Sequence, residues 1–168
     1  MEGYIREGKC NFADKNGNLV SDQWLVTVSD FKDGYALVKR EDGLWNFLSK
    51  DGKILHPSEW FVTAGNFCNG AARVRTTRNS LWNFITGEGK YLSYDWFTQA
   101  YDFTESGFAI VARYDNGYEY NFLNKDGNLL SNDEWFLKVK DFDESDNYQY
   151  AEVVRKNGKK DLIDRNGN

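Results

Sequence analysis

The sequence contains few of the residues on which metal centres and histidine-based catalysis depend. It has one histidine, His56, and two cysteines, Cys10 and Cys68, with no CxxC pair and no Cys/His cluster. A zinc site or other metal site is therefore not expected, and we expect free, partly buried thiols, with a disulfide as the alternative. The chain also lacks a glycine-rich phosphate loop and a GxSxG motif. His56 precedes the single proline and is predicted to lie in a loop or at a strand end.

Positive charge and long apolar runs are also lacking. Lys and Arg number 21 against 26 Asp and Glu, which gives a net charge of −5 and a pI near 5.0. Nucleic acid is therefore not expected as the main partner. The mean hydropathy is −0.70, and no apolar run reaches the roughly 18 residues of a membrane span. Residues 1–6 lack an apolar signal core, which predicts a cytoplasmic protein, or a secreted one if a leader has been removed.

Aromatic and turn-forming residues are abundant instead. Phe, Trp and Tyr make up 17% of the chain, and there are 15 glycines and one proline. Many Gly, Asn and Asp residues favour tight turns, and many aromatics favour strands. The composition predicts an all-β protein of short strands joined by hairpins, with enough apolar surface to fold.

An internal repeat dominates the sequence. An Asn-Phe pair that precedes a turn glycine begins at residues 11, 46, 83 and 121, and a weaker Asp-Leu copy begins at 161. In each full copy a Trp follows, then a Phe seven residues later, then an alanine and a valine two residues apart. These matches predict one repeat domain over residues 1–168, with units of approximately 9–43, 44–80, 81–118 and 119–158 and a partial unit, 159–168.

Three segments carry a resemblance to a known family. Residues 44–48 (LWNFL), 59–61 (EWF) and 69–74 (NGAARV) resemble the bacterial WG-containing repeat, and the resemblance covers essentially the whole chain. An Asn, at 46 and 83, stands where that family has the glycine after the first Trp. The resemblance implies a β-rich repeat protein and implies little about activity.

The repeat predicts an open array of about four antiparallel hairpin units, each of 35–40 residues, similar to a β-solenoid. Strands are expected near residues 35–40, 45–50 and 53–55, and a single helical turn is possible at segments such as 57–60 and 93–96. The segment that carries the Asn-Phe pair occurs five times and the other segments four times, which favours the open array. The alternative is a small, propeller-like closed ring.

Several recurring residues have a structural and a functional interpretation. The mid-strand Asn (residues 11, 46, 83 and 121) is predicted to brace the neighbouring backbone, with ligand contact as the alternative. The Trp residues at 24, 60, 96 and 135 are predicted to be core side chains. Trp45, Trp82 and Tyr120 either pack between units or form a stacking ladder on one face.

The candidate binding residues are these three aromatics and a group of tyrosines that do not recur. Tyr94, Tyr101, Tyr114 and Tyr118 are the binding candidates of that group, because tyrosine-rich surfaces recognise proteins, sugars and bases. The acidic run 141–146 is interpreted as a solvated loop, with a weak Ca²⁺ site as the alternative. No catalytic, cofactor or metal-ligating residue is expected.

We expect a non-enzymatic binding or scaffold module whose partner is another protein with a basic patch. The alternative is a small-molecule or glycan binder, or a sequestering protein, that uses Trp45, Trp82 and Tyr120 as stacking platforms. A polyphosphate ligand would require Arg73, Arg75, Arg78 and Arg113 to cluster. A third hypothesis is a hydrolase that uses carboxylates alone, as glycosidases do.

Overall fold

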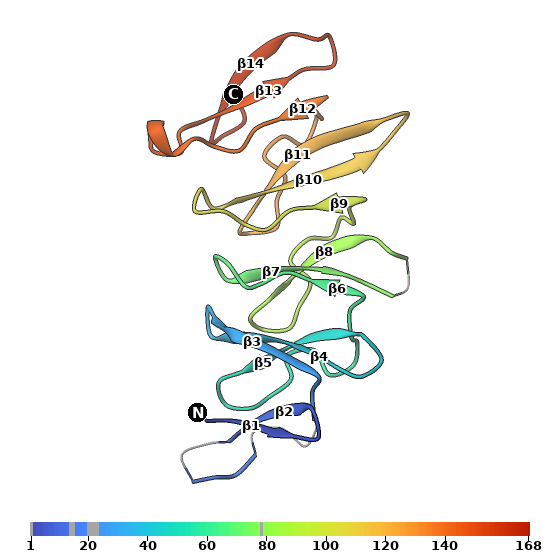
Figure 1. Ribbon diagram of the computed structural model, residues 1–168. Helices are drawn as coiled ribbons and strands as arrows, with labels where there is room; N and C mark the ends of the chain where they lie inside the picture. Colours follow the sequence, from blue (N-terminus) through green and yellow to red (C-terminus); the bar gives the residue numbers. More distant parts are fainter. Residues whose placement is uncertain (1, 14–15, 20–23, 78) are drawn as a thin grey trace.

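The computed structural model describes residues 2–13, 16–19, 24–77 and 79–168. Their strands form five small antiparallel sheets, which follow one another in chain order along an elongated, open stack (Figure 1). The expected all-β open array is confirmed. The alternative of a closed ring is wrong, because the N-terminal and C-terminal sheets lie at opposite ends of the stack (Figure 1).

The first sheet has two strands and each of the others has three. The first is β1 (Glu2–Arg6) with β2 (Lys9–Ala13), and the second is β3 (Thr27–Lys32), β4 (Tyr35–Lys39) and β5 (Trp45–Ser49). The third is β6 (Thr63–Ala64), β7 (Ala71–Arg75) and β8 (Trp82–Thr86). The fourth is β9 (Gln99–Ala100), β10 (Phe108–Tyr114) and β11 (Tyr118–Asn124), and the fifth is β12 (Lys138–Val139), β13 (Tyr150–Val154) and β14 (Lys160–Asp164).

Backbone bridges join each sheet to the next. The last strand of one sheet exchanges two hydrogen bonds with the residue that follows the recurring Trp of the same repeat, just before the next sheet begins. Trp45 and Phe61 do so at 2.8 and 2.9 Å, and Trp82 and Phe97 form the same pair one repeat later. Antiparallel pairing therefore continues through the stack, and successive sheets are held in a fixed register.

Aromatic side chains fill the spaces between the sheets. The Phe of each Asn-Phe pair packs edge to face against the recurring Phe that follows the Trp of the same repeat. Phe47 meets Phe67 with ring centroids 4.9 Å apart, and Phe84 meets Phe103 at 5.0 Å. Edge-to-face packing is a favourable geometry for two aromatic rings. Phe47, Phe84 and Phe122 are almost fully buried, so the periodic aromatics form the core.

One local expectation needs correction. The segments 57–60 and 93–96 form turns and bends, and the only helical turn in the described part of the chain is the 3₁₀ helix η1 (Glu144–Asp146). The segment 21–23 of the first repeat lies outside the described residues. Cys10 and Cys68 are free and half-buried, as expected. In the described part of the chain, no helix has the length and apolar character needed to cross a membrane.

Candidate functional site

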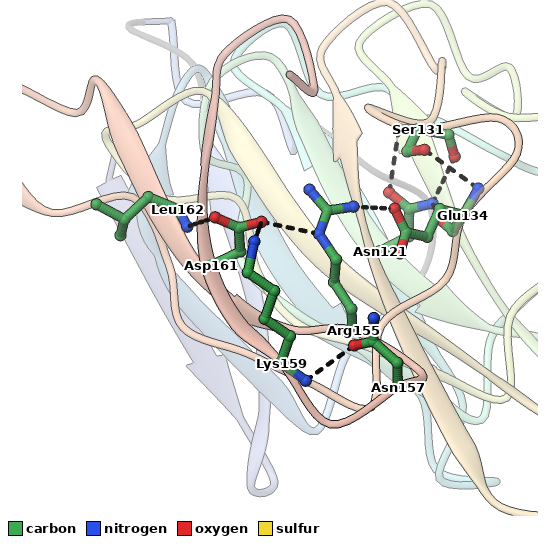
Figure 2. Close-up of polar contacts among 8 residues, drawn as sticks. All are labelled: Asn121, Ser131, Glu134, Arg155, Asn157, Lys159, Asp161 and Leu162. Atoms are coloured by element: carbon green, nitrogen blue, oxygen red, sulfur yellow. Dashed lines mark hydrogen bonds and ion pairs between the residues drawn. The ribbon is translucent and has the colours of Figure 1, made fainter.

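The recurring asparagine is a structural brace, as predicted. The Nδ2 of Asn121 donates to the carbonyl oxygens of Ser131 and Glu134, at 2.7 and 3.2 Å (Figure 2). Its Oδ1 accepts from the backbone N–H of Phe122 at 2.8 Å and of Ser131 at 3.4 Å. Asn46 and Asn83 make the same four contacts in their own repeats. Each amide fixes the loop that leads into the next sheet.

The recurring Trp residues divide into two groups. Trp60 and Trp135 are buried, and an arginine guanidinium lies over each ring: Arg40 at 4.4 Å and Arg113 at 4.5 Å from the ring centroid. Trp24 and Trp96 are half-buried, so the expectation that all four are core side chains is wrong for these two. Thr76 of the second repeat stands at the position equivalent to Arg40 and Arg113, and Trp96 of the third repeat packs against Tyr91 instead.

The predicted ladder residues Trp45, Trp82 and Tyr120 all lie at the backbone bridges between sheets. Each is half-buried. They are therefore neither fully packed between units nor fully exposed as a stacking ladder on one face. Lys39 lies over the ring of Trp45 at 5.0 Å, and Arg73 lies over Trp82 at 5.2 Å. Two of the three rings therefore already pack against a cation of this chain.

Tyr120 borders an open groove between the fourth and fifth sheets. The groove encloses about 420 Å³ and is lined by Tyr101, Ile110, Tyr120, Leu137, Lys138 and Val139. Tyr101 bonds through its backbone N–H to Ile110 O at 2.9 Å, which places the two side chains next to each other on the sheet. The groove therefore brings two predicted binding residues, Tyr101 and Tyr120, to one place.

Strand register extends this site along the sheet. Tyr114 pairs with Tyr118, and Ala112 pairs with Tyr120. Because alternate residues of a strand share a face, Tyr114, Tyr118 and Tyr120 all project from the same face as Tyr101. Tyr114 and Tyr118 pack edge to face at 5.3 Å, and they are 65% and 44% exposed. We call these four residues the tyrosine face. Tyr94 is fully exposed in the loop after β8 and is not part of it.

Carboxylates gather along one long side of the stack. The turns between the first and second strands of the four larger sheets all lie on the left in Figure 1. These segments, 30–34, 66–70, 102–107 and 141–149, define the acidic edge. Their charged side chains are eight carboxylates and one lysine: Asp30, Asp33, Asp102, Glu105, Asp141, Asp143, Glu144, Asp146 and Lys32. In the described part of the chain, only Asp102 of these carboxylates forms an ion pair, with Arg73 Nε at 2.7 Å.

The negative charge of the acidic edge helps to raise the pKa of two neighbouring side chains. The pKa of the Cys68 thiol is raised, first by burial and then by Asp33, Asp102 and Glu105. These three carboxylates come from the turns of two different sheets, so their fields add across the stack. Burial, Glu144 and a hydrogen bond to Glu105 raise the pKa of Tyr148 at the same edge.

Turns between the second and third strands of the larger sheets lie on the opposite edge of the stack (Figure 1), and several basic side chains there form ion pairs within the chain. Arg155 bonds Glu134 and Asp161 and so joins the fourth repeat to the last strand (Figure 2). Glu119 accepts from Arg113 Nη2 at 2.7 Å and from Lys156 Nζ at 2.5 Å. Arg113 and Arg73 are engaged with different carboxylates, so the arginine cluster that a polyphosphate would require is not formed by them. Arg78 lies outside the described residues.

The remaining residues considered for catalysis or metal binding, His56 and the acidic run 141–146, lie in loops. His56 is half-buried between the rings of Phe61 and Tyr91, and its backbone bonds Asn46. In the acidic run, Asp143 accepts from the backbone N–H of Ser145 and caps η1. Among the residues that the structure describes, no group of three His, Cys, Asp or Glu side chains is arranged to hold a metal ion.

Sequence reasoning did not identify Ile110, Leu137, Lys138 and Val139, nor the acidic edge as one surface. The carboxylates of that edge come from turns in different repeats, and only the stacking of the sheets brings them to one side. A comparison of equivalent turns between repeats would have revealed the pattern, because three of the four turns carry at least two acids.

No protein-family model matches the chain, and no curated protein matches its sequence. Among solved structures the chain is similar to the computationally designed Ika4 protein, with a TM-score of 0.44 and 11% identity over 85% of this chain and 92% of that chain. It is also similar to the WD40 β-propeller domain of Doa1, with a TM-score of 0.38 and 14% identity over 95% of this chain and 60% of that chain. Streptogramin B lyase matches with a TM-score of 0.38 and 9% identity, over 94% of this chain and 62% of that chain. The chain thus spans less than two thirds of the matched Doa1 and lyase chains.

Proposed function

We propose that this chain is a non-enzymatic interaction module whose acidic edge binds a basic segment of another protein. The observation that supports this is the row of carboxylates on turns of successive sheets, nearly all without an ion pair in the described part of the chain. Arg165 and Lys32 lie at this edge as well, so it carries an excess of negative charge. An excess of charge of one sign attracts a partner of the opposite sign and accelerates its association. One end of the tyrosine face adjoins this edge, because Tyr101 immediately precedes Asp102. Membership of the WG-repeat family is part of this proposal and rests on the periodic residues.

The test compares two variants of equal net charge. In the first, Asp33→Asn, Glu105→Gln and Glu144→Gln neutralise three carboxylates of the acidic edge. In the second, Glu7→Gln, Glu41→Gln and Asp115→Asn neutralise three carboxylates in turns of the opposite edge. Binding of a lysine-rich synthetic peptide is measured by calorimetry at low salt and at about 0.15 M salt.

The first variant is expected to bind the peptide about 10-fold more weakly than the unmodified chain, since each exposed charge contributes roughly 0.5 kcal/mol. The second variant is expected to retain nearly all of the affinity, and salt is expected to weaken binding to the unmodified chain. Equal losses in the two variants would show that only net charge matters, and the acidic edge would then not be the binding surface.

A second candidate is the binding of a small molecule or glycan in the groove between the fourth and fifth sheets. Two tyrosines and a cavity of about 420 Å³ support it. Native mass spectrometry of the purified protein checks this candidate, because a bound ligand would add a defined mass that the Tyr120→Ala variant would lose.

A further inference from the structure

The groove beside Tyr120 has a filled counterpart one repeat earlier. Between the third and fourth sheets, the guanidinium of Arg73 lies over the ring of Trp82 at 5.2 Å. Its Nη1 donates to the carbonyl oxygen of Ala100 at 2.9 Å, and its Nε pairs with Asp102 at 2.7 Å. The ion pair packs over Gly65, where any β-carbon would collide with Asp102. This chain therefore contains one complete intramolecular arginine site between two sheets.

One repeat later the arginine is missing but its surroundings are partly retained. Strand register places Ile110 at the position of Arg73, since Arg73 pairs with Phe84 and Ile110 with Phe122. The bridge from Tyr120 to Phe136 corresponds to the bridge from Trp82 to Phe97.

The acceptors of Arg73 have equivalents as well. Val139 lies three residues after its bridge residue, as Ala100 does, and it lines the groove. Asp141 precedes Phe142 as Asp102 precedes Phe103. Tyr101 stands in place of Gly65, and this exchange adds a second aromatic wall to the cavity.

We propose that this groove receives the guanidinium of an arginine from the basic segment of the partner, stacked on Tyr101 and Tyr120. The inference rests on the proposed function and names the residue that the partner inserts. Arginine fits this site because its planar group stacks on aromatic rings and donates several hydrogen bonds at once. The neighbouring turn contributes Asp141, the counterpart of Asp102, whose carboxylate matches the positive charge of the ligand.

Lys138 also lines the groove and forms no ion pair in the described part of the chain. Its charge opposes a cationic ligand and would favour an anionic one. The Lys138→Gln variant therefore separates the two ligand classes. It is expected to bind an arginine peptide more tightly than the unmodified chain does, whereas weaker binding would indicate an anionic ligand and would overturn the proposal.

The main experiment uses three lysine-rich peptides that differ only in a central arginine, lysine or citrulline. The arginine peptide is expected to bind about 5-fold more tightly than the other two, which is the range of one partly desolvated cation–π contact. Tyr101→Ala is expected to reduce its affinity to that of the lysine peptide. Tyr94→Ala, which changes an exposed tyrosine outside the groove, is the matched control and is expected to bind as the unmodified chain does.

A second variant keeps the proposal testable if Tyr101→Ala does not fold. Ile110→Arg installs the arginine that the preceding repeat already carries, and it is expected to abolish the preference for the arginine peptide while circular dichroism stays unchanged. If the arginine and lysine peptides bind equally and Tyr101→Ala has no effect, the arginine site is refuted while binding by the acidic edge stands. If no peptide binds, the proposed function fails together with this inference.

Discussion

Gly89 lies against the carbonyl oxygen of Leu55 of the preceding repeat, and a β-carbon built on Gly89 would stand 2.6 Å from that oxygen. Gly89 also has a φ of +73°, which side chains of L-residues rarely adopt. Gly167 stands in the same relation to Leu130 O, at 2.7 Å. The turns at Gly89 and Gly167 therefore set how closely their repeats approach the preceding ones.

Replacement of Gly89 by Ala is expected to destabilise the protein by about 3 kcal/mol, because strained φ and a backbone collision act together. Gly158→Ala is the matched control, since Gly158 has a φ of +81° and open space around it. It is expected to cost only about 1 kcal/mol. Urea unfolding of both variants measures the difference, and equal losses would mean that the contact with Leu55 has no energetic role.

Asn83→Ala is expected to destabilise the chain by about 2–4 kcal/mol, because it leaves buried backbone groups without their partners. The Asn83 amide donates to the carbonyl oxygens of Ser93 and Asp95 and accepts from the N–H of Phe84. Asn132→Ala changes an exposed loop asparagine and serves as the control. A loss below about 0.5 kcal/mol on denaturant unfolding, as for an ordinary surface change, would refute the bracing role.

Glu119→Gln is expected to remove a pH-dependent part of the stability. Hydrogen bonds from Lys156 and Arg113 hold the pKa of Glu119 below its ordinary value of 4.5. The stabilisation is therefore complete above pH 4.5 and is lost as the pH falls through the folded-state pKa. At neutral pH the variant should be about 1 kcal/mol less stable, a modest figure because both cationic partners are partly exposed.

The measurement for Glu119 is thermal unfolding of the unmodified chain and of the variant between neutral pH and pH 3. The stability gap should narrow only on the acid side of pH 4.5. Asp115→Asn removes an exposed carboxylate that makes no ion pair in the described part of the chain, and it is the control. A gap that stays constant down to pH 3 would contradict the ion-pair explanation.

The reactivity of the Cys68 thiol measures the electrostatic potential of the acidic edge in the absence of a binding partner. Its pKa is raised by burial and by Asp33, Asp102 and Glu105, so the reactive thiolate is scarce at neutral pH. Asp33→Asn combined with Glu105→Gln is expected to increase the alkylation rate of Cys68 by iodoacetamide about 2-fold at low salt. Peptide mass mapping resolves Cys68 from Cys10, and an unchanged rate would mean that these carboxylates do not act on the thiol.

The sequence predicted the repeat and its braces because both depend on contacts near in the chain. Asn46 bonds residues that lie 10 and 13 positions away, so the same side chain is needed in each repeat. The core aromatics recur for the same reason. Trp24 and Trp96 depart from the pattern because burial of the Trp ring depends on what covers it, as Arg40 covers Trp60.

The groove and the acidic edge could not be predicted in this way. The groove is lined by Ile110 and Tyr101, at the positions that Arg73 and Gly65 occupy one repeat earlier. Neither Ile110 nor Tyr101 is unusual in the sequence by itself. The difference is recognised only when strand register shows that Arg73 and Gly65 are the equivalent residues one repeat earlier. The side of the stack that a turn faces is set by the sheets, and single-residue patterns do not encode it.

The turns of the acidic edge vary in length while the strands beside them keep one register. The turn at Asn69 and Gly70 is tight, whereas the turn before β13 contains a 3₁₀ helix, yet Val74 pairs with Asn83 just as Val153 pairs with Asp161. Additional residues in these turns therefore leave the hydrogen-bonded strand pairing unchanged. An engineer could exchange or lengthen these loops to choose a new target, much as in a display scaffold, without redesigning the layers beneath.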